Sequence, residues 1–378
     1  MHYKCFLEKN GHEVIFDPKG ADVILVWTCG YRKDVIENSV SELNRYKSEY
    51  PGAIIALGCL PDIDRGLLKN AFKGIIVPWK EEVEFFEEYF HAAPGSFTRC
   101  SPVFYENEIC RDAAEYRRLY PEADVIFADQ FFKLLISQGC PYECSYCTER
   151  LAFPPYKSVS EDELVEACRI PVEQQGQRRI MLIGDCIGKY GSDIGSSLPR
   201  LIRRLHAKHP QTVYALQNFH PRNFLDFYED MEYFLKEGWI VHINLPIQSA
   251  SDRVLSAMKR QHTRKDLDRI FELMVSMNFR KFDTHIIVGF PGETESDFME
   301  TVDFLKKYRP MYALVSKYYD APTAVSFKIG NKIDNDTIQR RLELIENVMK
   351  KIGAVYNIDG ADFMQDRLRR INRQVKGI

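Results

Sequence analysis

"LLISQGCPYECSYCTER", residues 134–150, contains three cysteines, Cys140, Cys144 and Cys147, in a C-x3-C-x2-C spacing. A structural zinc site takes four protein ligands, and its cysteines usually come in two C-x2-C pairs, whereas this stretch has only one. A [4Fe–4S] cluster has four irons, so three thiolates leave one iron open to bind a substrate or cofactor. The spacing therefore favours an open iron–sulfur cluster over a zinc loop or a chance clustering of thiols.

The first of these cysteines follows a short apolar run, and similar runs recur along the next 180 or so residues. Runs of this kind, separated by gaps long enough for a helix, predict parallel strands at 133–137, 180–184, 213–217, 241–246, 284–290 and 312–318. Consecutive β/α units of this kind predict a partial (β/α)6 TIM barrel, whose chemistry lies at the carboxyl ends of its strands. Cys140 lies just after the first strand, where such a site belongs.

Several helices of the barrel have recognisable starts. Ser160 with Glu163 and Thr294 with Asp297 fit capping boxes. After the barrel, one amphipathic helix is expected from Asp334 to Gly353, followed by a polar, basic tail.

The first 93 residues alternate apolar runs and helical segments, which predicts a small open α/β domain of the flavodoxin-like class. Its expected strands are 12–16, 22–29, 53–59 and 74–78, and its expected helices are 32–49 and 80–91. Two of these strands end in a cysteine, Cys29 and Cys59. Ligands of such sheets bind at the carboxyl ends of the strands, which makes both thiols candidate ligands.

The chain thus has a predicted α/β fold in four parts. These are an N-terminal α/β domain (1–93), a linker (94–130), a partial barrel (131–330) and a C-terminal helix with a basic tail (331–378). The linker carries Cys100 and Cys110.

The composition limits the function classes. A net charge of −3 and a pI near 6.3 do not suggest a dedicated nucleic-acid domain, which is usually strongly basic. No apolar run is long enough for a membrane helix, and the N-terminus has no signal-peptide core, so a soluble, cytoplasmic protein is expected. Ten cysteines in a large cytosolic chain suggest metal or redox chemistry before disulfides.

The cysteine motif, with the aromatic Tyr146 before its last cysteine, resembles that of the radical S-adenosylmethionine (SAM) enzymes. Other segments resemble the methylthiotransferase-like branch of that superfamily. "LPIQSASDRVLSAMKRQHTRKD" (245–266) is similar to L-P-L-Q-S-G-S-D-x-V-L-x-x-M-x-R-x-Y-T-R, and "DTHIIVGFPGETESDF" (283–298) to D-I-I-V-G-F-P-G-E-T-x-x-D-F. "HPRNF" (220–224), "ADVILVWTCGYRKD" (21–34) and "ALGCLPD" (56–62) also resemble that branch, so the likeness covers most of residues 1–350.

The resemblance implies a [4Fe–4S] cluster on Cys140, Cys144 and Cys147 whose open iron chelates SAM. In that family SAM is cleaved to a 5′-deoxyadenosyl radical, which removes a hydrogen atom from a C–H bond, and a flavodoxin- or ferredoxin-type protein supplies the electron. The residues implied to line the SAM site are Tyr146, Gly184, Asp185, Gln248, Ser249, Gly289 and Pro291. Arg150 and Lys157 either hold a carboxylate or phosphate or carry solvated charge. His220 and Arg222 are candidates to reach the active site, and the alternative for Arg222 is a surface role.

Methylthiotransferases carry a second [4Fe–4S] cluster on three N-terminal cysteines, and the resemblance matches Cys29 and Cys59 to two of them. The third ligand is open. One alternative is that Cys5, Cys100 or Cys110 takes its place, and another is that an upstream segment which carries it is absent. The remaining alternatives are that the second cluster has only two protein thiolates or that this cluster is lost. Cys168 is expected to lie in the core. Cys186, at the barrel mouth, is expected to be an inert small hydrophobe, with a position facing the substrate as the alternative.

Three departures from the family concern the substrate. "TERLAFPPYKS" (148–158) lacks most of the family's arginines, "YYDAPTAVSF" (318–327) lacks its turn glycine, and the residues after Gly353 are too few for a TRAM domain. Because phosphate contacts need Lys and Arg, these departures favour a small-molecule or peptide substrate over nucleic acid.

The leading hypothesis is therefore a radical SAM enzyme that forms a C–S bond. The alternatives are a radical SAM enzyme of the same frame that performs a rearrangement or forms C–C bonds, a tRNA methylthiotransferase with a separate RNA-binding partner, and a non-enzymatic iron–sulfur carrier.

Overall fold

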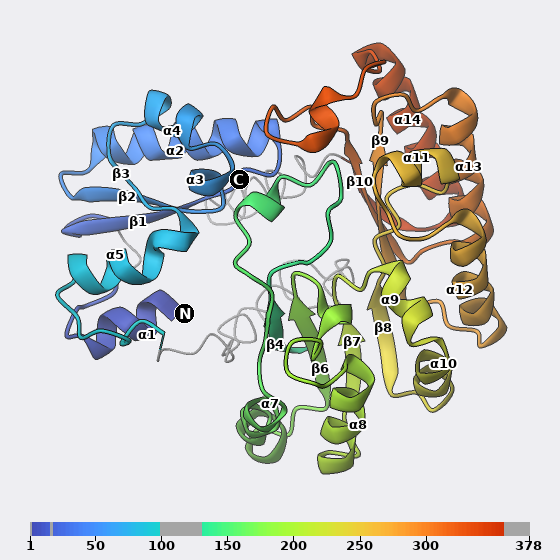
Figure 1. Ribbon diagram of the computed structural model, residues 1–378, viewed down its shortest axis with the longest axis horizontal. Helices are drawn as coiled ribbons and strands as arrows, with labels where there is room; N and C mark the ends of the chain where they lie inside the picture. The colour runs from blue at the N-terminus through green and yellow to red at the C-terminus, as the bar shows by residue number, and fades with distance from the viewer. Residues whose placement is uncertain (1, 16–17, 99–130, 359–378) are drawn as a thin grey trace, which may run out of the picture. The chain divides into compact units, whose positions relative to one another are not determined.

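The computed structural model describes residues 2–15, 18–98 and 131–358 (Figure 1), and these form two compact units. The first unit contains the described residues up to 98 together with Gln138–Tyr156 and Tyr319–Phe327. The second contains the other described residues. Cys100, Cys110 and the basic tail lie outside the described residues, and the four-part division of the chain stays a prediction.

The first unit contains a three-stranded parallel sheet in the order β1-β2-β3, with β1 at Val23–Thr28, β2 at Ala53–Gly58 and β3 at Ile75–Ile76. Ile54 and Ala56 of β2 pack toward α2 (Lys33–Glu49), α3 (Leu60–Ile63) and α4 (Arg65–Ala71). Ile55 and Leu57 pack toward α1 (His2–Lys9) and α5 (Glu82–Tyr89), which follows the short helix η1 (Trp79–Glu81). Helices thus cover both faces of the sheet (Figure 1), as the predicted open α/β domain requires.

The strand expected at 12–16 is wrong for the residues described there. Residues 12–15 have no regular structure, and the backbone N–H of His12 donates to the carbonyl of Leu7 at 3.0 Å. The segment is thereby tied to the end of α1 and does not pair with a strand. Val14 still packs against the core, which explains its apolar character.

The second unit is built on an eight-stranded sheet in the order β11-β10-β9-β8-β7-β6-β4-β5. The bounds are β4 (Phe132–Gln138), β5 (Lys157–Ser158), β6 (Arg179–Gly184), β7 (Val213–Leu216), β8 (Ile240–Asn244), β9 (Phe282–Val288), β10 (Tyr312–Lys317) and β11 (Val355–Ile358). The strands predicted for the barrel are confirmed, and β5 and β11 are additions that the sequence did not predict. From β4 through β6 to β11, neighbouring strands pair in parallel, so the carboxyl ends of these strands lie at one edge of the sheet.

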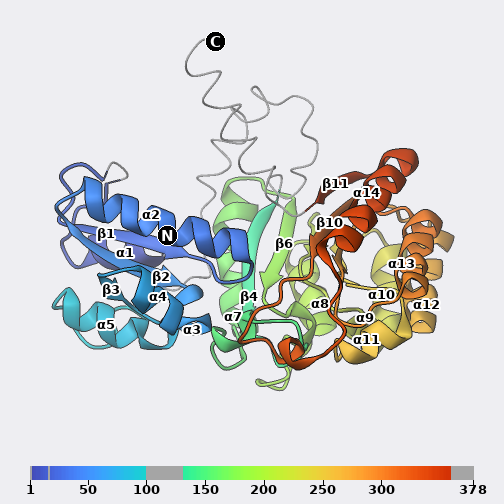
Figure 2. The same cartoon turned by 90° about the horizontal axis from the view of Figure 1, so that it is seen from above.

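Helices lie along the outer face of this curved sheet (Figure 2). The longer ones are α7 (Glu161–Ala167), α8 (Leu198–Lys208), α10 (Tyr228–Lys236), α12 (Arg264–Ser276), α13 (Glu295–Tyr308) and α14 (Asn335–Ile352). The shorter ones are η4 (Arg169–Gln174), η5 (Ile187–Lys189), α9 (Pro221–Asp226) and α11 (Asp252–Ala257). No helix within the described residues is both long and apolar enough to cross a membrane.

The predicted helix ends are largely confirmed. Thr294 and Asp297 form a reciprocal capping box at the start of α13. The hydroxyl of Ser160 accepts the Glu163 N–H, which is the first half of the predicted box. At α14, Asp334 caps the N-terminus and Gly353 ends the helix in a left-handed conformation.

Candidate active site

The three-cysteine loop follows β4 and lies in the first unit. Gly139 has a φ of +81°, and a Cβ on it would lie 2.5 Å from the carbonyl oxygen of Pro154. Only glycine therefore fits immediately before Cys140. The Cys147 N–H donates to the carbonyl of Cys144 at 3.2 Å, which closes a turn between these two cysteines. Burial, together with Glu149, raises the pKa of the Cys147 thiol to about 12.

The three thiols of the loop are a donor set that fits a [4Fe–4S] cluster with one open iron. Along the described stretches, no three His, Cys, Asp or Glu side chains lie close enough together to hold one metal ion.

The loop is anchored by its neighbours within the first unit. The carbonyl of Ser145 accepts the N–H of Ser326 at 2.8 Å, and Lys80 donates to the carbonyl of Leu151 at 2.9 Å. Leu151 ends the short helix η3 (Glu149–Leu151), on which the half-buried Arg150 lies. Tyr146 is also half-buried. The roles expected for Arg150 and Tyr146 in the active site stay predictions.

The structure brings Cys29 and Cys59 together. They follow β1 and β2, whose last residues, Thr28 and Gly58, are in register. The Gly30 N–H donates to Cys59 Sγ at 3.1 Å. A hydrogen bond between the two side chains lowers the pKa of Cys29 to about 6 and raises that of Cys59. The two thiols are therefore already placed to share a ligand at the carboxyl edge of the sheet.

Glu149 relates this pair to the three-cysteine loop. The pKa of Cys59 is raised mainly by its hydrogen bond with Cys29 and that of Cys147 mainly by burial, and the Glu149 carboxylate adds to both shifts. Cys5 packs on α1 against the apolar core that includes Phe6 and Phe86. Within the described residues, no group of three possible metal ligands includes it.

In the second unit, the predicted SAM segments lie at the carboxyl ends of neighbouring strands. Gly184 ends β6, and a Cβ on it would lie 2.6 Å from the carbonyl oxygen of Ser137. Gln248 follows β8 with a φ of +70°, and its backbone bonds to His285 O at 2.8 Å and to Ile287 N at 2.9 Å. A buried non-glycine residue in this conformation is strained, which is frequent at functional sites.

Other predicted SAM residues are placed less distinctively. Ser249 is fully buried, and its hydroxyl accepts the Ser251 N–H at 3.2 Å and lies 3.4 Å from the Thr301 hydroxyl. These bonds give it a structural role, and its contact with SAM stays a prediction. Asp185 is half-buried and Pro291 is buried.

A ladder of polar side chains that the sequence reasoning missed crosses these strands. Asn218 Nδ2 donates to the Gly184 carbonyl at 3.1 Å, and the Asn218 N–H donates to Asn244 Oδ1 at 3.3 Å. Asn244 Nδ2 lies 3.2 Å from His285 Nε2. Burial lowers the pKa of His285 to about 4, so its ring is neutral at pH 7. The sequence held one clue to this ladder, because His285 stands where the family pattern D-I-I-V-G-F has aspartate.

The remaining candidates divide into buried and exposed groups. His220 caps α9, its Nδ1 accepts the Arg222 N–H at 3.1 Å, and its ring lies edge-on to His262. Arg222 forms a surface ion pair with Asp226 at 2.9 Å, and Lys157 is exposed. Cys168, expected in the core, and Cys186, expected to be an inert small hydrophobe, are both buried.

Two family models match the chain. The radical SAM superfamily matches residues 134–305, and "Uncharacterized protein family UPF0004" matches residues 2–77. The first match covers the cysteine loop and the strands of the barrel up to β9, and the second covers the sheet that carries Cys29 and Cys59.

Curated relatives match over nearly the whole chain. A "Probable threonylcarbamoyladenosine tRNA methylthiotransferase" of Pyrococcus horikoshii is 26% identical, over 93% of this chain and 81% of that protein. "Ribosomal protein uS12 methylthiotransferase RimO" of Thermosipho melanesiensis is also 26% identical, over 94% of this chain and 80% of that protein.

Solved structures support the fold. The radical SAM methyltransferase TsrM from Kitasatospora setae has a TM-score of 0.57 at 14% identity, over 82% of this chain and 64% of that one. The cobalamin-dependent SAM radical enzyme OxsB has a TM-score of 0.53 at 10% identity, over 87% of this chain and 48% of that one.

The relatives of this chain are methylthiotransferases, and enzymes of the RimO type carry a second cluster. Radical SAM enzymes use a [4Fe–4S] cluster, SAM and a reductant. The chain thus carries a radical SAM domain preceded by a UPF0004 domain, and it is a radical SAM enzyme.

Proposed function

We propose that this enzyme replaces a substrate C–H bond with a C–S bond, in the manner of a methylthiotransferase. Cys140, Cys144 and Cys147 would hold the SAM-binding cluster, and Cys29 and Cys59 would hold a second cluster. When bound, the first cluster and SAM supply the radical that abstracts hydrogen.

The observation that carries the proposal is the placement of both thiol sets in one compact unit. Cys29 and Cys59 are hydrogen-bonded neighbours, and the segment Gln138–Tyr156, which carries the three-cysteine loop, belongs to the same unit. Enzymes of the RimO type carry a second cluster, and a second set of thiols in the unit of the three-cysteine loop is what such an enzyme needs. The paired thiols therefore favour sulfur chemistry over rearrangement and C–C bond formation.

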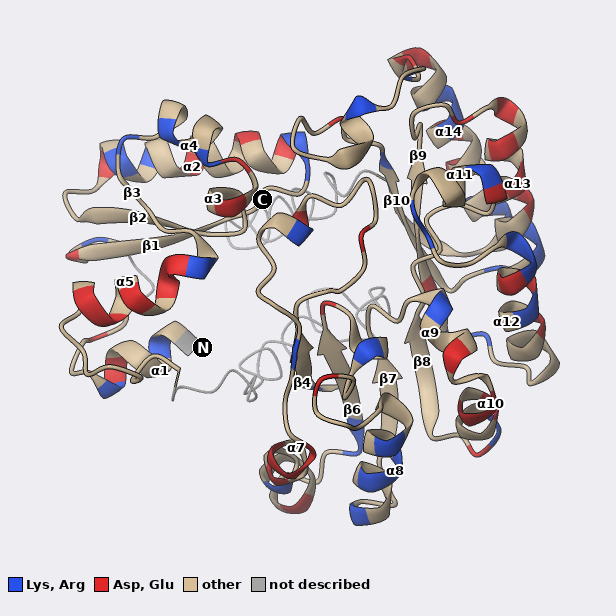
Figure 3. Cartoon of the chain, in the orientation of Figure 1, with Lys and Arg blue, Asp and Glu red and all other residues tan. Residues whose placement is uncertain are grey.

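For the substrate, we propose a small molecule or a peptide. Helix α8 is the most basic helix in Figure 3, and three of its arginines are engaged with acidic side chains. Arg203 lies 2.6 Å from Asp230, while Arg200 and Arg204 both lie 3.1 Å from Glu161. A nucleic-acid phosphate would have to compete with these carboxylates, which weakens the salt-dependent attraction that nucleic acids need.

Transfer RNA is the second candidate substrate. The name of the Pyrococcus horikoshii relative specifies tRNA, so the comparisons give no support to excluding nucleic acid. The name of the Thermosipho melanesiensis relative specifies ribosomal protein uS12, which agrees with a polypeptide substrate.

The test is the iron and sulfide content, with Mössbauer spectra, of anaerobically reconstituted protein. Wild type is compared with a variant in which Cys140, Cys144 and Cys147 are all alanine. We expect about eight irons in the wild type and about four in the variant, in a cubane. A variant without iron would mean that Cys29 and Cys59 hold no cluster, and the C–S proposal would then be rejected in favour of other radical chemistry.

The substrate class is tested separately. Retention of the enzyme on immobilised tRNA at low salt, lost as salt is raised, would support the tRNA candidate. No retention at low salt would support the small-molecule or peptide substrate.

A further inference from the structure

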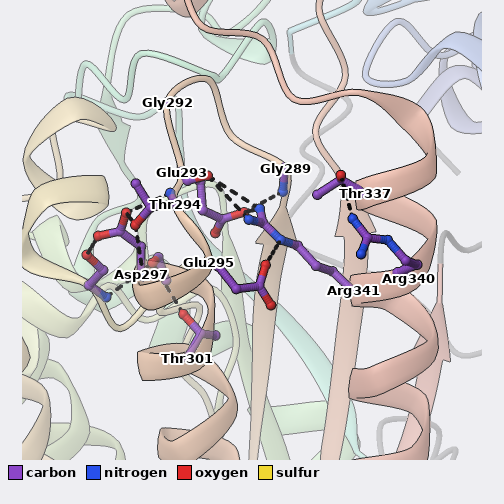
Figure 4. Close-up of polar contacts among 12 residues, drawn as sticks. Gly289, Gly292, Glu293, Thr294, Glu295, Asp297, Thr301, Thr337, Arg340 and Arg341 are labelled. Carbon is purple, nitrogen blue, oxygen red and sulfur yellow. Dashed lines mark hydrogen bonds and ion pairs between the residues drawn. The ribbon is translucent and has the colours of Figure 1, made fainter.

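The loop between β9 and α13 is closed by a buried carboxylate (Figure 4). Glu293 Oε2 accepts the Gly289 N–H at 2.7 Å, and the Glu293 N–H donates to the carbonyl of Phe290 at 2.9 Å. The loop is thus bonded across by both the side chain and the backbone of one residue. Gly289 and Pro291 within it are predicted to contact the adenine of SAM.

Helix α14 supplies the counter-charge. Arg341 Nη1 lies 3.0 Å from Glu293 Oε2, and Nη1 and Nη2 donate to the Glu293 carbonyl at 3.5 and 3.4 Å. Arg341 Nε donates to Glu295 at 3.1 Å. The Arg341 and Glu293 side chains are 5% and 1% exposed, so this ion pair is buried. Removing one member of a buried pair leaves an uncompensated charge, which forces the surroundings to rearrange.

The same helix also restricts Gly289 directly. Gly289 has a φ of +82°, and a Cβ on it would lie 2.5 Å from Ile338 Cγ1. Ile338 and Arg341 are three residues apart and hence on one face of α14. Helix α14 therefore holds both ends of the loop, although it lies beyond residue 305, where the radical SAM match ends.

We propose that Arg341 is a positioning residue for SAM, which acts through Glu293 to fix the loop backbone from Gly289 to Pro291. The proposal rests on the predicted role of this loop in the SAM site. A buried ion pair contributes little net stability compared with apolar packing of the same volume. Its effect here is to hold a ligand-contacting backbone in one geometry, which lowers the ordering cost of binding.

The test compares Arg341→Met with Arg340→Met in the full-length, reconstituted enzyme. Arg340 is the adjacent residue on α14, but it is exposed and donates to Thr337 at 2.9 Å, away from Glu293 (Figure 4). The readouts are the SAM dissociation constant from equilibrium dialysis, the EPR spectrum of the reduced cluster with and without SAM, and the iron content.

For Arg341→Met we expect a dissociation constant raised about tenfold or more, which corresponds to about 1.4 kcal/mol, with unchanged iron content. The EPR change caused by SAM should then need correspondingly more SAM. Arg340→Met should stay within about twofold of wild type. Arg341→Lys should restore only part of the affinity, because lysine keeps the charge but lacks the planar fork.

A purely structural role for Arg341 would give the opposite pattern. Thermal stability would fall while the SAM dissociation constant and the EPR response stayed at wild-type values, and the proposal would be overturned. If Arg341→Met does not fold, Glu293→Gln removes the same charge pair at constant shape, and an unchanged dissociation constant would be equally decisive. Failure of the C–S proposal is seen in iron content and product, so the two are distinguishable.

Discussion

Asp297 of α13 accepts a hydrogen bond of 2.6 Å from the hydroxyl of Ser251, which precedes α11. The same carboxylate accepts the Thr294 N–H at 2.7 Å and pairs with Arg253. One buried acid therefore caps its own helix and connects it to the segment that follows β8. Although burial opposes ionisation, hydrogen bonds from Arg253, Ser251 and Thr294 hold the pKa of Asp297 well below its usual range.

We expect Asp297→Ala to lower the free energy of unfolding by about 3 kcal/mol, because it leaves Arg253 and the start of α13 without their acceptor. A folded pKa below the unfolded one means that this stabilisation is complete above the usual pKa of aspartate and declines as the pH falls below about 4. Urea unfolding at pH 7 and at pH 3.5 would measure both effects. If Asp297→Ala lowers the free energy of unfolding by the same amount at both pH values, the pH-dependent stabilisation does not come from Asp297.

Glu293 should have the opposite pH dependence. Burial raises its pKa from 4.5 to about 7, against the lowering effect of Arg341 and the Gly289 N–H. The folded state therefore holds a proton that the unfolded state releases, so its contribution to stability is full below pH 4.5 and is lost as the pH rises to about 7.

Glu293→Gln, which cannot ionise, should remove this pH dependence, an effect of roughly 3 kcal/mol at most. Urea unfolding of wild type and Glu293→Gln between pH 5 and pH 8 would measure it. The charges around this loop, Arg253 of α11, Glu295 and Asp297 of α13 and Arg341 of α14, are unchanged in the variant and serve as the internal reference. Parallel stability profiles for the two proteins would show that Glu293 is already ionised at pH 5.

Gly289→Ala should destabilise the fold by about 2 kcal/mol or more, because it combines a left-handed φ with a contact of 2.5 Å to Ile338. In the double variant Gly289→Ala/Ile338→Ala the close contact with the side chain of residue 338 is relieved, but the strain of the left-handed φ at residue 289 remains. The double variant should therefore lose less stability than the two single losses added together. Additive losses in chemical unfolding would mean that Ile338 does not contact residue 289.

The cysteines of the first unit should differ in their effect on iron. Cys29→Ala and Cys59→Ala should each lower the iron content from about eight toward about four, because each removes one thiol of the pair. Cys5→Ala should retain the iron, since the Cys5 side chain packs against the core. Cys168→Ala, a change at a buried core thiol, is the control. Loss of iron in Cys5→Ala would restore Cys5 as a ligand.

Much of the fold could be predicted because it depends on local pattern. Apolar runs located the barrel strands, and Asp334 and Gly353 marked both ends of α14. The proximity of Cys29 and Cys59 was also predictable, because neighbouring parallel strands end at one edge. The strand predicted at 12–16 is wrong because an alternating apolar pattern does not by itself supply a partner strand.

The long-range polar contacts around the site could not be predicted from local sequence pattern. Arg341 and Glu293 are 48 residues apart, and no periodicity connects them. The ladder from Asn218 through Asn244 to His285 depends on strand order and register, which appear only in the folded sheet. Strand β11 has only four residues, Val355–Ile358, and it forms where β10 offers an edge for pairing.

The first unit is assembled from three separate stretches of chain: the N-terminal residues, Gln138–Tyr156 and Tyr319–Phe327. The polypeptide therefore enters the first unit three times. Neither unit can be excised as one continuous fragment. Cleavage within 99–130 would separate the N-terminal sheet from the segment that carries Cys140, Cys144 and Cys147. Grafting the N-terminal residues onto another barrel would have to bring both later segments with them.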